Sequence, residues 1–518
     1  MARVAQRLAR AASGPRAWSI GKVSKQLQSL SGGTLSRLPR ELAVPGYARA
    51  RVRAGIVHIG VGNFHRAHEA LVLDRCLHLP GHQDWGIVGV GLGKGADAAR
   101  KAKDLEEQSC LYTVTECAPD GARSSRVIGS IIRYLHAPAN PEAVLEALSD
   151  PGIRIVSLTI TEGGYNICEA TGEFDLTHPD VVHDLTHHDV PRTAFGHIVE
   201  ALARRRASGA GPFTVMSCDN LRHNGDVAKL AVLSFARAKD PRLGDWIENH
   251  VTFPNTMVDR IVPAVTPEDR STLNASMGVD DRIPVRAEAF LQWVIEDRFC
   301  SGRPDLAAAG VELRDDVRDF EVIKGRMLNG SHVLLCFPAV LLGYREVHQA
   351  LSDPSLAKLL DRFMERDVMP LLIAPSGVSL RDYKSMVLGR FANPAIRDQL
   401  LRICANGAVK LPTFLFKTLA ACLDQGRDID RFAFVLACFR RYLRGRDEAG
   451  AAYAVDEPHI TPADQVASSR DPLDTLRIDA FASLDLAGNR GFVRRYLKFT
   501  DMIAAEGVSI ALEAASAD

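Results

Sequence analysis

The feature that most constrains the fold is a short apolar run that ends in two glycines one residue apart. Residues 55–59 (GIVHI) are typical of a buried strand, and the turn 60–62 (GVG) follows at once. Such a turn permits a close approach of the backbone to a pyrophosphate, next to the N–H groups of the following helix. His65 stands where the usual dinucleotide fingerprint has its third glycine. The motif therefore predicts a nucleotide site only in the right context.

That context is a series of further apolar runs with helical patterns between them. The runs cover residues 85–92, 153–158 and 213–217, and the helical patterns include residues 66–77 and 194–206. Strands that alternate with helices predict an α/β fold with a doubly wound parallel sheet. Ligands of such sheets bind at the carboxyl ends of the strands.

Polar residues stand at two of these strand ends. Thr159 follows one run, and Asp219 and Asn220 follow another. Asn220 is placed to hold a nicotinamide or a reacting oxygen, but Asp219 and Asn220 are equally compatible with a cap for the helix that begins near Asp226.

The segment after the run 85–92 bears on the choice of cofactor. Asp97 lies where an acid can bind the ribose hydroxyls of NAD, whereas nearby Lys94 keeps NADP open. A solvated loop residue is an equally compatible interpretation of Asp97.

A second polar group lies at residues 324–332 (KGRMLNGSH). In a regular α-helix, Lys324 and His332 lie within about 80° of each other around the axis, and Asn329 lies about 60° beyond His332. A lysine whose pKa is lowered by burial can act as a base, while Asn and His donate hydrogen bonds to a substrate oxygen. Solvated or capping roles are the plainer alternative. Helical patterns at 356–366, 393–404, 415–423 and 432–443 predict a second, mostly α domain.

Composition excludes several classes of partner. The 63 Lys and Arg residues balance 63 Asp and Glu residues, so nothing favours nucleic acid or an anionic membrane. The 10 cysteines form no C-x-x-C pair or zinc-finger spacing, which indicates reduced, mostly buried thiols of an intracellular protein. We expect a cytoplasmic monomer.

The N-terminal segment differs from the rest of the chain. It is basic, with no acidic residue before Glu41, which is typical of a mitochondrial transit peptide but also of a disordered extension. We predict an arm at 1–48, a nucleotide-binding domain at 49–313 and a helical substrate domain at 314–518.

Five motifs in order resemble the long-chain mannitol dehydrogenase family, and most closely its mannitol 2-dehydrogenase branch. They are GIVHIGVGNFHRAH from Gly55, TITEGGY from Thr159, MSCDN from Met216, MVDRI from Met257 and Lys-x4-Asn-Gly-Ser-His from Lys324. The resemblance implies a Rossmann-like domain with extra elements, followed by a mostly α-helical domain. It also implies metal-independent, reversible oxidation of D-mannitol at C2 to D-fructose with NAD. D-arabinitol or a sugar acid such as fructuronate or mannonate is the alternative substrate, and a non-catalytic NAD-binding protein is the remote alternative.

The resemblance also assigns roles to individual residues. Lys324 is the general base in oxidation and the general acid in reduction, Asn220 and Asn329 hold the reacting oxygen, and His332 orients the substrate. Glu321 relays the proton, unless it is only a surface partner of Lys324. The substrate-binding set is Asp259, Arg402 and Lys410. The cofactor-binding set is Gly60, Val61, Gly62, Asn63, Phe64, His65, Asp97, Thr159 and Val258.

Overall fold

The computed structural model describes residues 27–168 and 171–517, and the basic segment 1–26, with its transit-peptide prediction, lies outside the described residues. Two compact units divide the chain between Arg318 and Asp319. Within the described residues, no helix is long and apolar enough to span a bilayer.

The first unit is built on a parallel sheet of five strands in the order β6-β3-β2-β7-β8. Val57 of β2 lies beside Val88 of β3 and Val156 of β7. The four predicted strands are confirmed, with ends that differ by one or two residues. The strands are β2 (Ala54–Ile59), β3 (Gly86–Gly91), β6 (Ile131–His136), β7 (Ile155–Leu158) and β8 (Thr214–Ser217).

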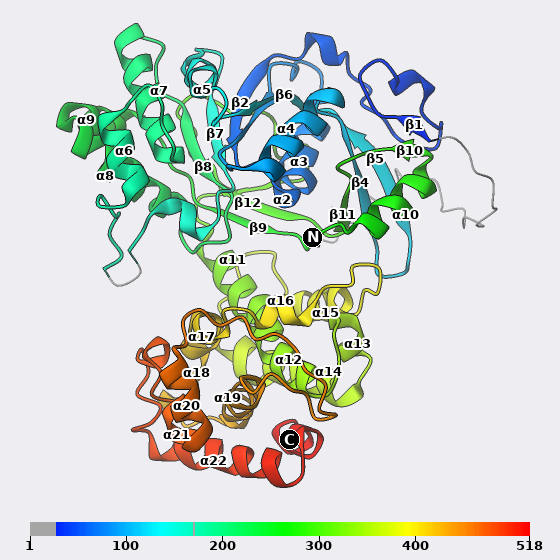
Figure 1. The fold of residues 1–518 in the computed structure, drawn as a ribbon, viewed down its shortest axis with the longest axis vertical. Coiled ribbons are helices and arrows are strands. Elements are labelled where there is room, and N and C mark those ends of the chain that lie inside the picture. Colours follow the sequence, from blue (N-terminus) through cyan, green and yellow to red (C-terminus); the bar gives the residue numbers. More distant parts are fainter. Residues whose placement is uncertain (1–26, 169–170, 518) are drawn as a thin grey trace. The chain divides into compact units, whose positions relative to one another are not determined.

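Helices cover both faces of this sheet (Figure 1). Because successive strand residues point to opposite faces, Val57 and Ile59 belong to one hydrophobic core and Ile56 to another. The first core includes α5 (Pro141–Ser149), α7 (Ala194–Ser208), α8 (Asn224–Lys239) and α9 (Pro241–His250). The second includes α2 (Asn63–Ala67) and α3 (Glu69–Leu77). Helix α4 (Ala96–Glu107) lies along β6.

The helix predicted over residues 66–77 is interrupted. It begins earlier, at Asn63, and breaks at His68, where φ is −117° and ψ is −91°. Side chains from elsewhere in the unit take the carbonyl groups at the break: Tyr112 donates to Arg66 and Arg260 donates to Ala67. These tertiary bonds replace helical ones, so the local pattern could not reveal the break.

Three smaller sheets are the extra elements of this unit. They comprise β4 (Tyr112–Cys117) between β5 (Arg123–Ile128) and β11 (Val285–Glu288), β12 (Gln292–Glu296) between β9 (Thr256–Asp259) and β13 (Glu312–Arg314), and the pair β1 (Gln28–Ser29) with β10 (Val279–Asp280). Leu30, Leu38 and Leu42 are buried in one core with Val279 and with Leu273 of α10 (Pro267–Met277). The part of the predicted N-terminal arm from residue 27 onward therefore packs on this unit.

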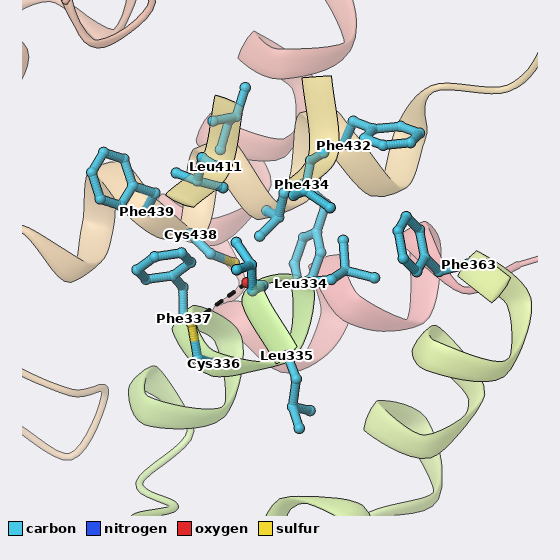
Figure 2. Close-up of a cluster of buried hydrophobic side chains, with 14 of the residues drawn as sticks. Leu334, Leu335, Cys336, Phe337, Phe363, Leu411, Phe432, Phe434, Cys438 and Phe439 are labelled. Atoms are coloured by element: carbon cyan, nitrogen blue, oxygen red, sulfur yellow. Dashed lines mark hydrogen bonds between the residues drawn. The ribbon is translucent and has the colours of Figure 1, made fainter. Parts of the chain in front are cut away.

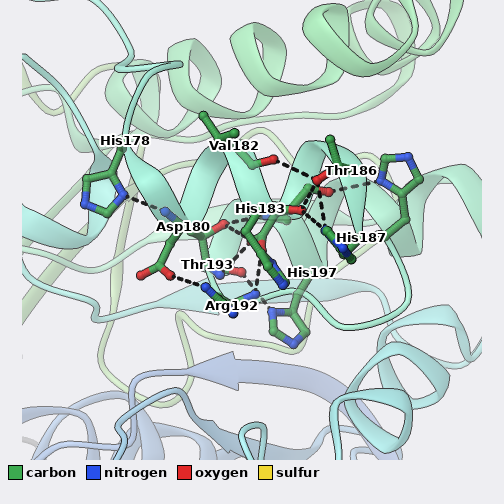
Figure 3. A network of polar contacts seen from close by, with 12 residues as sticks. His178, Asp180, Val182, His183, Thr186, His187, Arg192, Thr193 and His197 are labelled. Carbon is green, nitrogen blue, oxygen red and sulfur yellow. Dashed lines mark hydrogen bonds and ion pairs between the residues drawn. The ribbon is translucent and has the colours of Figure 1, made fainter.

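A buried carboxylate fixes the connection between α6 (Pro179–Thr186) and α7. Asp184 accepts hydrogen bonds of 2.8 Å from the backbone N–H of Arg192 and of Thr193. Thr193 in turn caps α7 by accepting from Gly196 N–H at 2.9 Å. Figure 3 shows Arg192 and Thr193 in this polar network. The network ties the outer helices of the sheet together.

The second unit is helical, as predicted. Helix α12 (Gly330–Leu341) is buried at the centre of this unit. Its Leu334 and Phe337 lie among aromatic side chains such as Phe434 and Phe439 (Figure 2). Around it lie α13 (Val347–Leu351), α14 (Pro354–Arg362), α15 (Leu380–Phe391), α16 (Leu400–Cys404), α17 (Gly407–Leu411), α18 (Lys417–Asp424), α19 (Asp430–Tyr442), α20 (Pro462–Arg470), α21 (Pro472–Thr475), α22 (Arg490–Ala505) and α23 (Val508–Ala515).

Two of the predicted helices differ from those observed. The helix expected over 393–404 begins only at Leu400, because Asn393 accepts from Ala395 N–H at 3.0 Å in a turn around Pro394. The helix expected over 356–366 changes to π-helical geometry at Phe363. Both departures depend on local hydrogen bonding that apolar periodicity does not encode.

Candidate active site

The turn after β2 requires glycine at one position and leaves open space at the other. Gly60 has φ of +104°, and a Cβ atom there would lie 2.1 Å from the Thr159 carbonyl oxygen. A Cβ at Gly62 would meet nothing nearer than the Gly60 carbonyl oxygen, at 3.8 Å. Gly60 therefore makes the tight turn, and Gly62 leaves room for a group to approach the backbone. Both properties fit the diphosphate of a dinucleotide.

Buried polar side chains bind this turn and one another through hydrogen bonds. Thr159 Oγ1 donates to the Gly60 carbonyl at 2.6 Å, and His58 Nε2 lies 2.9 Å from Thr159 Oγ1. His58 Nδ1 lies 3.0 Å from Glu69 Oε2, and Ser157 Oγ donates to Glu69 Oε1 at 2.7 Å. The predicted residue Thr159 thus contacts the turn itself. Sequence reasoning missed His58, Ser157 and Glu69, and the signal was a polar residue inside each of two apolar strands.

His65 belongs to the same buried cluster. Its ring stacks on that of His58, with centroids 3.5 Å apart and planes 10° apart, and burial lowers its pKa well below the ordinary value. The cofactor role predicted for this side chain remains a prediction.

The donor atoms of His58, His65 and Glu69 lie within 4.8 Å of one another, a spacing that a shared metal ion could span. Two stacked imidazoles cannot both direct an in-plane lone pair at one ion, and His58 Nδ1 already faces Glu69 and Ser157. The geometry fits a hydrogen-bonded brace better than a metal centre. The expected lack of a metal remains a prediction.

The charged side chains of the segment after β3 are exposed to solvent. The Asp97 side chain is 88% exposed and pairs with Arg100 at 2.9 Å, while Lys94 Nζ lies 3.9 Å from Asp180. Residues 91–95 (GLGKG), at the end of β3, contain no carboxylate. The ribose-binding role of Asp97 therefore stays a prediction.

At the end of β8, neighbouring residues differ in environment. Asp219 is buried and accepts from the N–H groups of Ile160 and Thr161, at 3.0 and 2.9 Å. Burial raises the pKa of Asp219 above its ordinary value. Asn220, the predicted oxygen holder, is exposed. Asp219 therefore anchors the loop after β7, and Asn220 is displayed beside it.

The predicted residues of the MVDRI motif lie on and just after β9. Val258 and Asp259 are both buried. Arg260 pairs with Glu116 at 2.5 Å and donates to the Glu288 carbonyl at 3.0 Å. The structure thus assigns Arg260 to a structural ion pair with Glu116.

Lys324 begins a π-helical segment that runs to Asn329 and continues into α12. The angles predicted for a regular α-helix are therefore wrong, since each residue of the wider i→i+5 turn rotates the chain by a smaller angle about the helix axis. Lys324 is buried, whereas Glu321, Asn329 and His332 are partly exposed. The His332 ring stacks on Phe391 of α15, with centroids 3.9 Å apart. A Cβ at Gly325, the residue after Lys324, would meet no atom within 4 Å.

The two predicted substrate cations lie on helices that pack on α12. Arg402 on α16 is exposed and pairs with Asp398 at 2.7 Å. Lys410 on α17 donates to the carbonyls of Arg402 and Ile403, at 3.3 and 3.0 Å, and burial lowers its pKa. Glu457, which sequence reasoning missed, accepts from Gly407 N–H at 2.7 Å and so fixes the start of α17.

Comparison with known proteins covers both units. Residues 54–308 match the mannitol dehydrogenase Rossmann domain, and residues 316–503 match the mannitol dehydrogenase C-terminal domain. A polyol:NADP oxidoreductase of Gluconobacter oxydans (strain 621H) is 47% identical over 93% of this chain and 99% of its own length. A mannitol 2-dehydrogenase of Phaeosphaeria nodorum is 41% identical over 92% of this chain and 84% of its own length.

Two solved structures are similar throughout. A D-sorbitol dehydrogenase in substrate-free form has 46% identity and a TM-score of 0.86, over 93% of this chain and 100% of its own. The Pseudomonas fluorescens mannitol 2-dehydrogenase, in a ternary complex with NAD and D-mannitol, has 40% identity and a TM-score of 0.85, over 94% and 99%. The fold and these matches define a polyol dehydrogenase, an oxidoreductase. As its motifs predict, the chain belongs to the mannitol dehydrogenase family.

Proposed function

We propose that this chain catalyses the reversible oxidation of D-mannitol at C2 to D-fructose, with NAD as the hydride acceptor. The observation that carries this proposal is the likeness to named mannitol 2-dehydrogenases, which extends over more than nine-tenths of the chain. The Lys-x4-Asn-Gly-Ser-His motif supplies groups suited to this chemistry. One proton and one hydride leave the alcohol, and the proton ends in water.

Lys324 is the proposed base. Oxidation removes the hydroxyl proton of C2 as the C2–H bond breaks, so a basic atom must lie beside that oxygen. Lys324 is buried at the start of the π-helical segment. In the reverse direction the ammonium returns the proton to the carbonyl oxygen. Glu321, one turn earlier, is proposed to pass that proton to water.

Asn220 and Asn329 are the proposed holders of the reacting oxygen. As the proton leaves, negative charge develops on this oxygen, and amide N–H groups stabilise that charge. His332, held flat against Phe391, is proposed to orient the neighbouring hydroxyls. Asp259, Arg402 and Lys410 are proposed to bind the rest of the polyol chain.

The cofactor is proposed to bind across the turn at Gly60 and Gly62, with Val61, Asn63, Phe64, His65, Asp97, Thr159 and Val258 around it. When bound, its nicotinamide supplies the acceptor for the hydride. We propose NAD because the Pseudomonas fluorescens relative was solved with NAD.

A second candidate is NADP-linked oxidation of a polyol such as D-sorbitol. Two observations favour it: no carboxylate follows β3 at residues 91–95, and a relative with 47% identity is named a polyol:NADP oxidoreductase. D-sorbitol and D-mannitol are epimers at C2, so oxidation of either at C2 yields D-fructose. Fructose reduction alone therefore cannot separate the two substrates.

The test is fructose reduction with NADH and with NADPH in parallel, with and without a chelator, followed by chromatography of the product. We expect NADH-dependent formation of mannitol that the chelator does not change. Sorbitol as the main product, or turnover with NADPH only, would favour the second candidate. If neither cofactor reduces fructose, oxidation of D-arabinitol and mannonate is assayed next, and binding of NADH without any turnover would favour a non-catalytic protein.

A further inference from the structure

A lysine outside every predicted site reaches the dinucleotide turn from a neighbouring helix. Lys101 lies on α4, and its ammonium donates a short hydrogen bond to the Val61 carbonyl, in the middle of the turn 60–62. Its side chain is partly buried, and burial is the main cause that lowers its pKa to about 8. A cation is thus held within the turn that fits a diphosphate.

The charges around Lys101 are mainly positive. Arg66, a second and almost fully buried cation, is the charged group that lowers the pKa of Lys101 further. Among the described residues, no carboxylate forms an ion pair with Lys101 or with Arg66. Burial lowers the pKa of Arg66, and the nearby carboxylate of Asp281 acts against that shift. Asp281 itself accepts hydrogen bonds from Gln108 and Thr113.

The hydrogen-bond partners of the Arg66 guanidinium are neutral groups. Its guanidinium donates to the Ile283 carbonyl and to Asn63 Oδ1, and it lies 5.1 Å from the centre of the Tyr112 ring. Two cations therefore lie near the turn with neutral oxygens as their direct partners. Charged groups enclosed in this way are costly unless an opposite charge compensates them.

The short helix after the turn gives the lysine a clear purpose. Helix α2 has only five residues, so few peptide dipoles align toward a phosphate at its start. A lysine that reaches the turn supplies a full positive charge instead, as the lysine of a P-loop does for its nucleotide. The turn is open at Gly62, where a phosphate can approach.

We propose that Lys101 is a cofactor-binding residue whose ammonium moves from the Val61 carbonyl to a phosphate group of the bound dinucleotide. This inference rests on the proposed function, since it requires that a dinucleotide binds at this turn. The phosphate is either the diphosphate that NAD and NADP share or the 2′-phosphate that only NADP carries. Comparing the two cofactors distinguishes these sources.

The test uses the full-length chain with Lys101→Met, which keeps the unbranched stem of the side chain but lacks the ammonium, and Lys101→Arg, which keeps the charge. Lys103→Met is the matched control, because Lys103 lies on the same helix with a 72% exposed side chain paired to Glu107. Dissociation constants for NADH and NADPH are measured by fluorescence titration. Thermal melting and turnover at saturating cofactor are measured alongside.

We expect Lys101→Met to weaken both cofactors by about 10- to 100-fold, as for loss of a hydrogen bond to a charged group. Lys101→Arg restores most of the affinity, and Lys103→Met leaves it unchanged. Turnover at saturating cofactor and the Michaelis constant for fructose stay within about threefold, because Lys101 does not touch the substrate. Weakening of NADPH alone would assign Lys101 to the 2′-phosphate.

Wild-type affinity in Lys101→Met would overturn the inference, as would a lower melting temperature without a change in affinity. If Lys101→Met does not fold, Lys101→Gln and the salt dependence of NADH binding to the wild-type protein replace it. Affinity that does not fall as salt rises would also overturn the inference. A wild-type chain that binds neither cofactor would instead refute the proposed function, so the two failures are distinct.

Discussion

The turn at residues 60–62 and the helical segment at 324–332 carry the two halves of the proposed chemistry, and they are built differently. The turn is held by side chains that come from other elements: Thr159 from the end of β7, His58 from within β2 and Lys101 from α4. The segment 324–332 is one continuous helix whose spacing is set by its own backbone, through a π-helical stretch.

This difference indicates how each region should respond to mutation. In the turn, several neighbours share the work of holding one backbone shape, so the loss of one bond weakens binding by a modest factor. In the helix, each proposed residue has its own chemical task, so one loss removes a step. We therefore expect large effects on turnover from the helix and smaller effects on cofactor affinity from the turn.

The largest expected effect is that of Lys324→Ala. Without the base, turnover should fall about 10²- to 10⁴-fold, whereas NADH affinity should stay within about threefold. Lys498→Ala, on α22, is the control, because Lys498 is an exposed lysine of the helical unit. Stopped-flow turnover and fluorescence titration measure both quantities. Near-normal turnover at neutral pH would show that Lys324 is not the base.

The next effect concerns the two asparagines. Asn329→Ala and Asn220→Ala should each lower turnover about 10²-fold, because each removes one donor to the developing negative charge. Steady-state kinetics at saturating cofactor measure the loss. If Asn220→Ala changed only the cofactor's Michaelis constant, Asn220 would belong with the turn rather than with the oxygen.

The same contrast explains what could be predicted from the sequence. Four of the five strands of the central sheet and the Gly-x-Gly turn followed from local apolar runs, whereas β6 was not predicted, and the Lys324 motif was recognisable as a whole. The break at His68 was not predictable, because it depends on Tyr112 and Arg260 binding freed carbonyls. The π-helical spacing after Lys324 leaves no trace in apolar periodicity.

Residues of the turn's support were missed for a related reason. His58 and Glu69 look like isolated polar residues until the fold brings them within 3.0 Å of each other. Lys101 lies 40 residues from the carbonyl that it contacts. Contacts between elements that lie far apart in the sequence cannot be derived from residue spacing alone.

A smaller effect is expected from pH, acting on the turn. The pKa of free Lys101 is lowered to about 8 by burial and by Arg66, and neighbouring His65 is held neutral by burial. The Lys101 ammonium is present below about pH 8 and loses its proton above it. NADH should therefore bind up to about tenfold more weakly at pH 9 than at pH 7. Fluorescence titration across this range measures the change. Lys101→Arg, which keeps its charge, should show a flat profile.

Thr159→Val should have a still smaller effect. It removes the hydroxyl that donates to the Gly60 carbonyl at 2.6 Å but keeps the shape of the side chain. A neutral hydrogen bond contributes about 1 kcal/mol, so NADH affinity should fall about fivefold with turnover unchanged. Thr159→Ser, which retains the hydroxyl, should restore affinity. A loss of turnover without a loss of affinity would place Thr159 in the chemical step.

The smallest effect is expected from Asp97→Asn. Its measurement decides between two interpretations of Asp97. In the structure, Asp97 is exposed and its partner is Arg100, an ion pair of the kind that contributes about 0–1 kcal/mol. If this ion pair is the whole role of Asp97, NADH affinity should change by less than about twofold. If Asp97 instead binds the ribose hydroxyls, NADH should bind several-fold more weakly while NADPH binds as well or better, because an acid that repels the 2′-phosphate has been removed. Titration with both cofactors separates these outcomes. Only the second outcome would show that a residue beyond β3 sets the choice between the two cofactors.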